Sequence, residues 1–165
     1  MKRRPVLHLP DPDLRRVAET ISPFKRSELE PLFEEMVATM RQLRGIGLAA
    51  TQIGLHQRVA VIELKDGPII LINPVMKKLS RKQEIDEEGC LSVPGIFGLV
   101  PRSFSLTLVA YDMDGKKFTS DAHGLFARVI QHEVDHLNGK VFVDRCTKLT
   151  AGHDRAQSLG ITIPA

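Results

Sequence analysis

Hydrophobic side chains recur at spacings of three and four between residues 27 and 45, in the stretch SELEPLFEEMVATMRQLRG. This period matches one face of an α-helix, so we predict an amphipathic helix here. Ser27 and Glu30 form a capping-box pattern at its start, and Gly45 can end it. The helix is therefore predicted to begin near Ser27 and to end near Gly45.

A second helix is predicted from about His123 to Asn138. At about 100° per residue, one of its sides carries only apolar side chains, namely Phe126, Ile130, Val134 and Leu137. The opposite side mixes apolar and polar residues: Leu125, Arg128, Val129, His132 and His136. We therefore expect a helix that is buried on both sides, with plain core on one and imidazoles on the other.

Apolar runs bounded by turn residues predict strands at 57–64, 69–74 and 105–112, and the stretch KKFTSD predicts another at 116–121. Asp114 and Gly115 suit the hairpin turn between the last two. The order helix, strands, helix predicts an α+β fold, with mostly antiparallel sheets packed around the central second helix. We expect one catalytic domain over residues 1–165, with a short C-terminal tail from about residue 147.

Composition narrows the class of function. The chain has 165 residues, of which 42% are hydrophobic, which is enough for a real core. The net charge is +3, and the Lys and Arg residues are scattered among acidic residues. The chain has one Tyr and no Trp, so a base-stacking surface is not expected. No apolar run is long enough for a signal sequence or a membrane span, so we expect a cytoplasmic protein without a membrane or direct nucleic-acid role.

The stretch QHEVDHLNG, residues 131–139, carries the strongest chemical signal. On a helix, His132 and His136 lie on one face, where both imidazoles can reach one metal ion. Glu133 lies beside them, close enough to take a proton from a water molecule at the metal. Two histidines do not complete a metal site, so a third ligand must come from elsewhere.

The usual third ligands of HExxH peptidases can be tested directly. One large group uses a downstream glutamate, but no Glu follows Glu133 in this chain. Another group extends the motif to HExxHxxGxxH, and the last position here is Phe142. Upstream, Cys90 stands in the glycine-rich stretch DEEGCLSVPG. A thiolate with two imidazoles suits Zn²⁺ or Fe²⁺ and leaves one coordination position open, so Cys90 is the favoured third ligand.

Two alternatives remain at this point. An HExxH metallopeptidase could use Asp144 or His153 as its third ligand. A non-catalytic RNA- or ribosome-binding module could use the metal as a structural staple, with Cys146 or His153 as the fourth ligand.

Three stretches together resemble the signature motifs of peptide deformylases: GIGLAATQIG (45–54), EEGCLSVPG (87–95) and QHEVDHLNG (131–139). The opening VLHLPDPDLRRVA and the later LINP are also similar to that family. The resemblance implies a metal-dependent hydrolase that removes the N-formyl group from formyl-methionyl polypeptides and releases formate. It implies metal ligands Cys90, His132 and His136, the general base and acid Glu133, and two oxyanion donors, the Gln52 side chain and the Leu91 N–H.

Substrate-binding residues are expected nearby. Glycines around position 47 would let an extended substrate backbone approach closely. An apolar pocket for the methionine side chain is expected from Ile46, Leu125 and Val129, so that the full expected set is Ile46, Gly47, Gly89, Leu125 and Val129. The resemblance also implies one divalent metal, with Fe²⁺ favoured and Zn²⁺, Ni²⁺ or Co²⁺ able to occupy the site.

Two features depart from the bacterial deformylases that the chain resembles. Arg128 lies one turn before His132, where an apolar pocket residue is common. We expect its stem to run along the pocket rim to solvent, the alternative being that it attracts acidic substrate side chains. The tail after Cys146 contains Gly152 and Gly160 and lacks a long charged helix. The resemblance implies nascent formyl-methionyl chains as partners. Because the tail lacks the long charged helix, ribosome docking through the tail is not implied.

Overall fold

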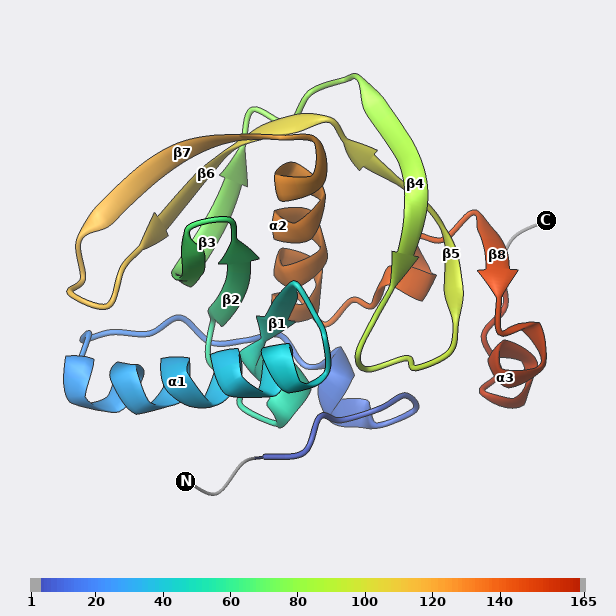
Figure 1. Ribbon diagram of the computed structural model, residues 1–165, viewed down its shortest axis with the longest axis horizontal. Coiled ribbons are helices and arrows are strands. Elements are labelled where there is room, and N and C mark those ends of the chain that lie inside the picture. The colour runs from blue at the N-terminus through green and yellow to red at the C-terminus, as the bar shows by residue number, and fades with distance from the viewer. Residues whose placement is uncertain (1–3, 164–165) are drawn as a thin grey trace.

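The computed structural model describes residues 4–163, and Figure 1 shows the arrangement of its elements. The helices are α1 (Arg26–Gln42), α2 (Gly124–Leu137) and the short α3 (His153–Ser158). The strands are β1 (Gly47–Ala49), β2 (Val59–Leu64), β3 (Gly67–Lys77), β4 (Gln83–Gly89), β5 (Phe97–Ser103), β6 (Ser105–Tyr111), β7 (Lys117–His123) and β8 (Lys148–Ala151). Short 3-10 helices occupy Pro12–Arg15, Ala50–Ile53 and Phe142–Asp144.

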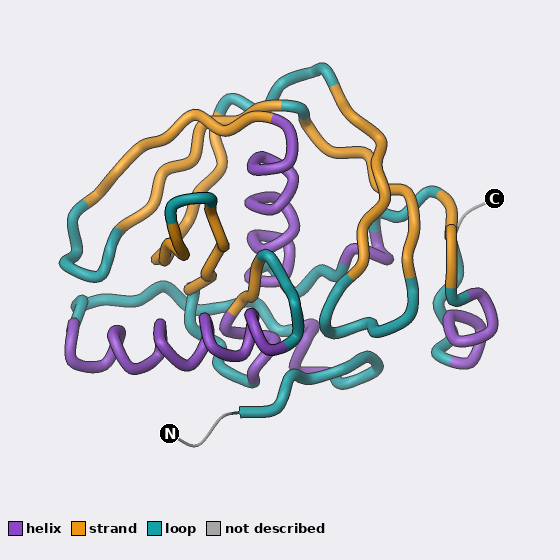
Figure 2. The backbone as a smooth tube through the Cα atoms, viewed as in Figure 1, coloured by secondary structure: helices purple, strands orange, loops and turns teal. Residues whose placement is uncertain are grey.

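Two sheets lie on either side of α2 (Figures 1 and 2). A five-stranded sheet has the order β1-β2-β3-β6-β7, and a three-stranded sheet has the order β4-β5-β8. All pairings between these strands are antiparallel. The predicted α+β fold with antiparallel sheets around the HExxH helix is therefore confirmed.

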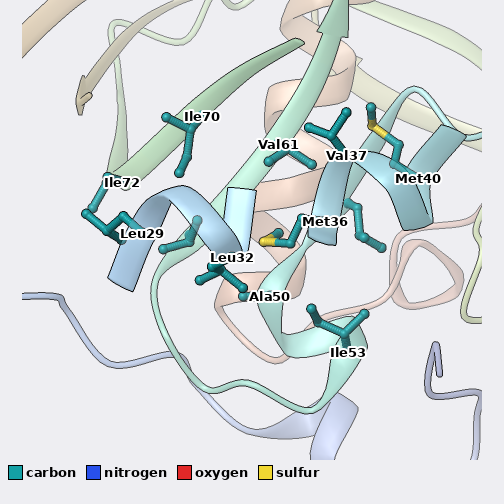
Figure 3. Close-up of a cluster of buried hydrophobic side chains, with 12 residues drawn as sticks. Leu29, Leu32, Met36, Val37, Met40, Ala50, Ile53, Val61, Ile70 and Ile72 are labelled. Atoms are coloured by element: carbon teal, nitrogen blue, oxygen red, sulfur yellow. The ribbon is translucent and has the colours of Figure 1, made fainter. Parts of the chain in front are cut away.

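Helix α1 closes one face of the five-stranded sheet. Its apolar stripe packs on β2 and β3 in the cluster drawn in Figure 3, where Met36 and Met40 are fully buried. The capping-box prediction was wrong: the helix begins at Arg26, with Lys25 as N-cap and no side-chain cap bond. The end is near the predicted place, because Gly45 N–H donates to the Met40 carbonyl at 2.9 Å just after the last turn.

Helix α2 is buried on both sides, as its sequence predicts. Ala127, Ile130 and Val134 pack into a core cluster with side chains from β2, β3, β6 and β7. The opposite side faces the β4–β5 hairpin. Because apolar packing holds one side and polar contacts hold the other, the rotation of α2 about its axis is fixed.

The predicted strands near 57–64, 69–74, 105–112 and 116–121 correspond to β2, β3, β6 and β7. Four strands were missed, of which β4 and β5 matter most for function. Strand β4 reads QEIDEEG and is exposed over most of its length, while β5 contains Gly98 and Pro101. Neither carries the clean apolar alternation by which strands are recognised.

The segment after Cys146 supplies the third strand of the three-stranded sheet and then forms α3. Strand β8 pairs with β5, and Ala156 of α3 is buried in a cluster with Val93 and Ile96. Helix α3 has six residues and ends before Gly160. Within residues 4–163 no helix has the length and apolar character needed to cross a membrane.

Candidate metal centre

Three potential ligand atoms meet between α2 and the turn that follows β4. Cys90 lies directly after the last residue of β4, while His132 and His136 lie one turn apart on α2. The His136 Nε2 atom lies 3.2 Å from Cys90 Sγ and 3.2 Å from His132 Nε2. All three ligand atoms lie within 4.8 Å of one another, and residues 4–163 contain no other such group of three.

This geometry fits a single metal ion. Two imidazole nitrogens bound to one tetrahedral zinc lie about 3.3 Å apart, close to the spacing found here. One thiolate and two imidazoles form a borderline-soft donor set with one open position. The site is also shielded from solvent, because His136 is only 1% exposed. The Nδ1 atom of His136 is buried and has no hydrogen-bond partner among the described residues.

Glu133 lies against the backbone of β1. A Cβ atom placed on Gly47 would lie 2.2 Å from Glu133 Oε1, so any larger residue at position 47 would force this carboxylate to move. The side chain is buried, and Oε2 has no hydrogen-bond partner within residues 4–163. Burial raises the pKa of Glu133 to about 7, although the nearby His132 opposes the rise.

The Cys90 sulfur is surrounded by hydrogen-bond donors. The Gln52 side-chain amide nitrogen lies 3.6 Å from Sγ and donates to the Ser92 hydroxyl at 3.1 Å, while the Ser92 backbone N–H lies 3.4 Å from Sγ. The other end of the Gln52 amide is fixed by the Ala49 N–H at 2.9 Å. Gln52 is therefore held in one orientation, with its NH₂ group facing the thiol.

Behind the histidines lies a buried network that the sequence analysis missed. Glu88 Oε2 accepts a hydrogen bond from His132 Nδ1 at 2.9 Å, so that Nε2 faces Cys90 and His136. Arg102 binds the same carboxylate through two nitrogens, at 2.9 and 3.0 Å, and also binds Asp135. Burial alone would raise the pKa of Glu88, but the hydrogen bonds from His132 and Arg102 lower it below its usual range.

A cavity of about 740 Å³ opens beside Cys90 and His132. Its lining includes Cys90, His132, Glu133, Gln52 and Leu91, and also the whole predicted substrate-binding set, Ile46, Gly47, Gly89, Leu125 and Val129. The side chains of Ile46 and Leu125 are 50% and 65% exposed, which places them at its mouth. The structure thus brings every predicted site residue to one place.

The residues required by the two alternatives lie elsewhere. Asp144 forms an ion pair with Arg15 and accepts the Val141 N–H. Cys146 is buried and donates to a backbone carbonyl of β8. His153 is the first residue of α3 and lies on the surface. None of these three belongs to the ligand group around His132 and His136.

The expectation for Arg128 was wrong. Its stem was expected to reach solvent, but the residue is only 5% exposed. The guanidinium donates to Glu88 Oε1 at 2.8 Å, to the Val100 carbonyl at 2.8 Å and to the Glu84 carbonyl at 2.7 Å. Hydrogen bonds to these acceptors offset the cost of burying the charge, so the side chain turns inward.

A helix that carries HExxH, with a glutamate beside two imidazoles, is typical of metal-dependent hydrolases. Comparison with known proteins identifies the family: residues 3–151 match the model described as Polypeptide deformylase. The chain therefore belongs to the peptide deformylase family.

Individual relatives agree with this assignment. The chain is 44% identical over 145 residues to the peptide deformylase of Desulforudis audaxviator, covering 87% of this chain and 94% of that protein. A crystal structure of the Thermotoga maritima peptide deformylase superposes with a TM-score of 0.86 at 36% identity, covering 88% of this chain and 99% of that one. The Synechococcus elongatus enzyme, solved in complex with actinonin, gives 0.83 at 38% identity, covering 87% and 80%.

Proposed function

We propose that the chain, as a peptide deformylase, carries out its reaction at the site formed by Cys90, His132 and His136. The reaction is hydrolysis of the N-formyl group of a formyl-methionyl polypeptide, which releases formate and a free amino terminus. One observation carries the assignment of the site. Cys90, His132, Glu133 and Gln52 line one cavity, and the His136 ligand atom lies within 4.8 Å of those of Cys90 and His132.

Cys90, His132 and His136 would hold one divalent metal ion. When bound, the metal supplies Lewis acidity, which polarises the formyl group and makes a water molecule more acidic. We propose Fe²⁺ as the resident metal, with Zn²⁺, Ni²⁺ or Co²⁺ able to replace it. The proposal is supported by the donor set, since one thiolate with two imidazoles suits these borderline metals.

Glu133 is the proposed general base and acid. Within residues 4–163 its Oε2 atom is buried and has no hydrogen-bond partner, so it can take a proton from the attacking water and return it to the leaving amine. The Gln52 NH₂ group and the Leu91 N–H are the proposed donors to the negative charge that develops on the formyl oxygen. Gln52 is already fixed by the Ala49 N–H, and loss of one such donor typically slows a reaction by about 10² to 10³.

The cavity supports the substrate assignment. Ile46, Leu125 and Val129 give it an apolar side that suits a methionine side chain. Gly47 is the first residue of β1 and Gly89 is the last residue of β4, and both line the cavity. We propose that the substrate backbone passes between them. Formyl-methionyl chains are made at ribosomes, so we propose a cytoplasmic site of action. We assign no ribosome-docking role to α3, which has only six residues.

The test is formate release from formyl-Met-Ala-Ser by the protein loaded with Ni²⁺ or, without oxygen, Fe²⁺. Glu133→Gln keeps the shape of the side chain but cannot accept the proton, so formate release should fall by at least about 10² while metal content stays the same. Acetyl-Met-Ala-Ser serves as the control substrate. Cleavage within that peptide would favour a peptidase, and undiminished formate release by Glu133→Gln would exclude Glu133 as the base.

A further inference from the structure

The two halves of the proposed metal site belong to separate parts of the fold. His132 and His136 lie on α2, which packs on the five-stranded sheet, whereas Cys90 lies in the turn of the β4–β5 hairpin. Figure 1 shows this hairpin standing beside α2. The spacing of the three ligands therefore depends on how firmly the hairpin is held against the helix.

Hydrogen bonds and ion pairs join the hairpin to the helix. We call the residues that make them the α2–hairpin seam: Glu88, Arg102 and the backbone of Ser103 on the strands, with Arg128, Gln131, His132 and Asp135 on the helix. Gln131 exchanges two hydrogen bonds with the Ser103 backbone, at 2.9 and 3.0 Å. Arg102 joins Glu88 to Asp135.

Of the two arginines in the seam, Arg128 is the one that lines the cavity beside Cys90. Arg102 and the neighbouring Arg145 line a smaller, separate cavity together with Gln131 and Asp135. Arg128 instead lines the cavity that contains Cys90 and His132. Its guanidinium reaches both strands of the hairpin, through the Glu84 carbonyl of β4 and the Val100 carbonyl of β5.

We propose that Arg128 is a positioning residue, which locks the Cys90-bearing hairpin onto α2 and so fixes the distance between Cys90 and the two histidines. The same guanidinium binds Glu88 Oε1, while Glu88 Oε2 binds His132. One side chain thus restrains the hairpin backbone and the carboxylate that orients a ligand. This role rests on the proposed metal site, and it concerns the spacing of the ligands rather than the chemical step.

A guanidinium is suited to this position because it donates in several fixed directions at once. Arg128 uses two nitrogens to reach three acceptors on two strands. A lysine keeps the charge and most of the stem but carries a single nitrogen, so it cannot hold both strands in the same geometry. A methionine keeps the stem and removes both the charge and the hydrogen bonds.

The experiment compares Arg128→Lys and Arg128→Met with the wild type, each loaded with Co²⁺. Arg145→Met is the matched control, because Arg145 belongs to the same buried network through Asp135 but touches neither Glu88 nor the hairpin carbonyls. Release of Co²⁺ to an excess of chelator is followed by loss of the thiolate-to-cobalt absorption. Hydrogen exchange of the β4–β5 amides is measured in parallel on the metal-free proteins.

Both Arg128 variants should release Co²⁺ about tenfold faster than the wild type and should exchange the hairpin amides faster, whereas Arg145→Met should match the wild type. Faster release in Arg128→Met alone, with Arg128→Lys unchanged, would overturn the proposal, because charge rather than position would then matter. Slower release of Co²⁺ from Arg128→Met would also overturn the proposal, because the charge of Arg128 rather than its position would then control metal release. Faster exchange without faster release would also overturn it, since Arg128 would then only stabilise the hairpin.

Failure of the proposed metal site would look different. Wild-type protein would then bind Co²⁺ without a thiolate-to-cobalt band, whatever residue stands at position 128. If Arg128→Met does not fold, Arg128→Lys still tests the proposal, because it retains the stem and the charge.

Discussion

The close approach of Glu133 to β1 can be tested by adding one methyl group at Gly47. In Gly47→Ala the new Cβ would lie 2.2 Å from Glu133 Oε1, 2.8 Å from Cδ and 3.0 Å from Cγ. Ordinary carbon–oxygen contacts lie above about 3.2 Å, so the carboxylate must move by about 1 Å. The backbone itself should tolerate alanine, because Gly47 is not among the glycines with a left-handed φ.

A displacement of about 1 Å in a reacting group typically costs about 10² in rate, equivalent to about 2.7 kcal/mol of barrier. We therefore expect kcat for formyl-Met-Ala-Ser to fall about a hundredfold in Gly47→Ala. Metal content should not change, since Glu133 does not belong to the ligand group. The assay is formate release at saturating substrate, with metal content and Tm measured on the same preparation.

A double-substitution cycle decides whether the loss acts through Glu133. Glu133→Ala removes the Oε1, Cδ and Cγ atoms that the added methyl group would meet. In that background Gly47→Ala should change kcat by less than about threefold, because the two sites then no longer clash. A hundredfold loss in both backgrounds would refute the reasoning and would point to the pairing of β1 with β2, in which Gly47 lies opposite Ile62.

Three further predictions concern the ligand, the network and the second sheet. Cys90→Ser should weaken Zn²⁺ binding by at least about tenfold, measured by chelator competition, because a hydroxyl is a poorer ligand than a thiolate; unchanged affinity would mean that Cys90 is not a ligand. Arg102→Met should lower the free energy of unfolding by about 3 to 5 kcal/mol in denaturant titrations, because it leaves the buried Glu88 carboxylate less compensated; a loss below about 1 kcal/mol would contradict this. Gly98→Ala would place a Cβ 2.3 Å from Cys146 Sγ and 2.7 Å from the Lys148 carbonyl of β8, so it should push β8 away from β5 and lower Tm, with kcat within about threefold of wild type; an unchanged Tm would show that the two strands adjust without cost.

The part of the site carried by α2 could be predicted from sequence because it depends on helical geometry alone. His132 and His136 are four residues apart, and any regular helix brings their imidazoles to one face. Cys90 required more, namely the absence of a downstream glutamate and the glycine-rich context around the cysteine. The strands β2, β3 and β6 were predictable for a similar reason, since each carries a run of apolar residues between turn signals, and β7 follows the Asp114-Gly115 turn signal.

The supporting network could not be predicted in the same way. Glu88 is 44 residues from His132, and Arg102 is 33 residues from Asp135, so no local period connects them. The hairpin that brings them together was missed as well, because β4 is a polar edge strand with one exposed apolar residue, Ile85. Glu88 stands inside the EEGC motif, but the motif does not say which helix residue its carboxylate binds.

The inward turn of Arg128 shows why this seam is polar. Buried ion pairs contribute little net stability, because the cost of removing charges from water offsets most of their attraction. Apolar side chains could hold the hairpin against α2 equally firmly, but they would not fix its position along the helix. The guanidinium groups of Arg102 and Arg128 donate in fixed directions to defined oxygens, and the acceptors include Glu88, which orients His132. We infer that the buried charge serves ligand geometry, which a metal ion shared between two elements of the fold requires.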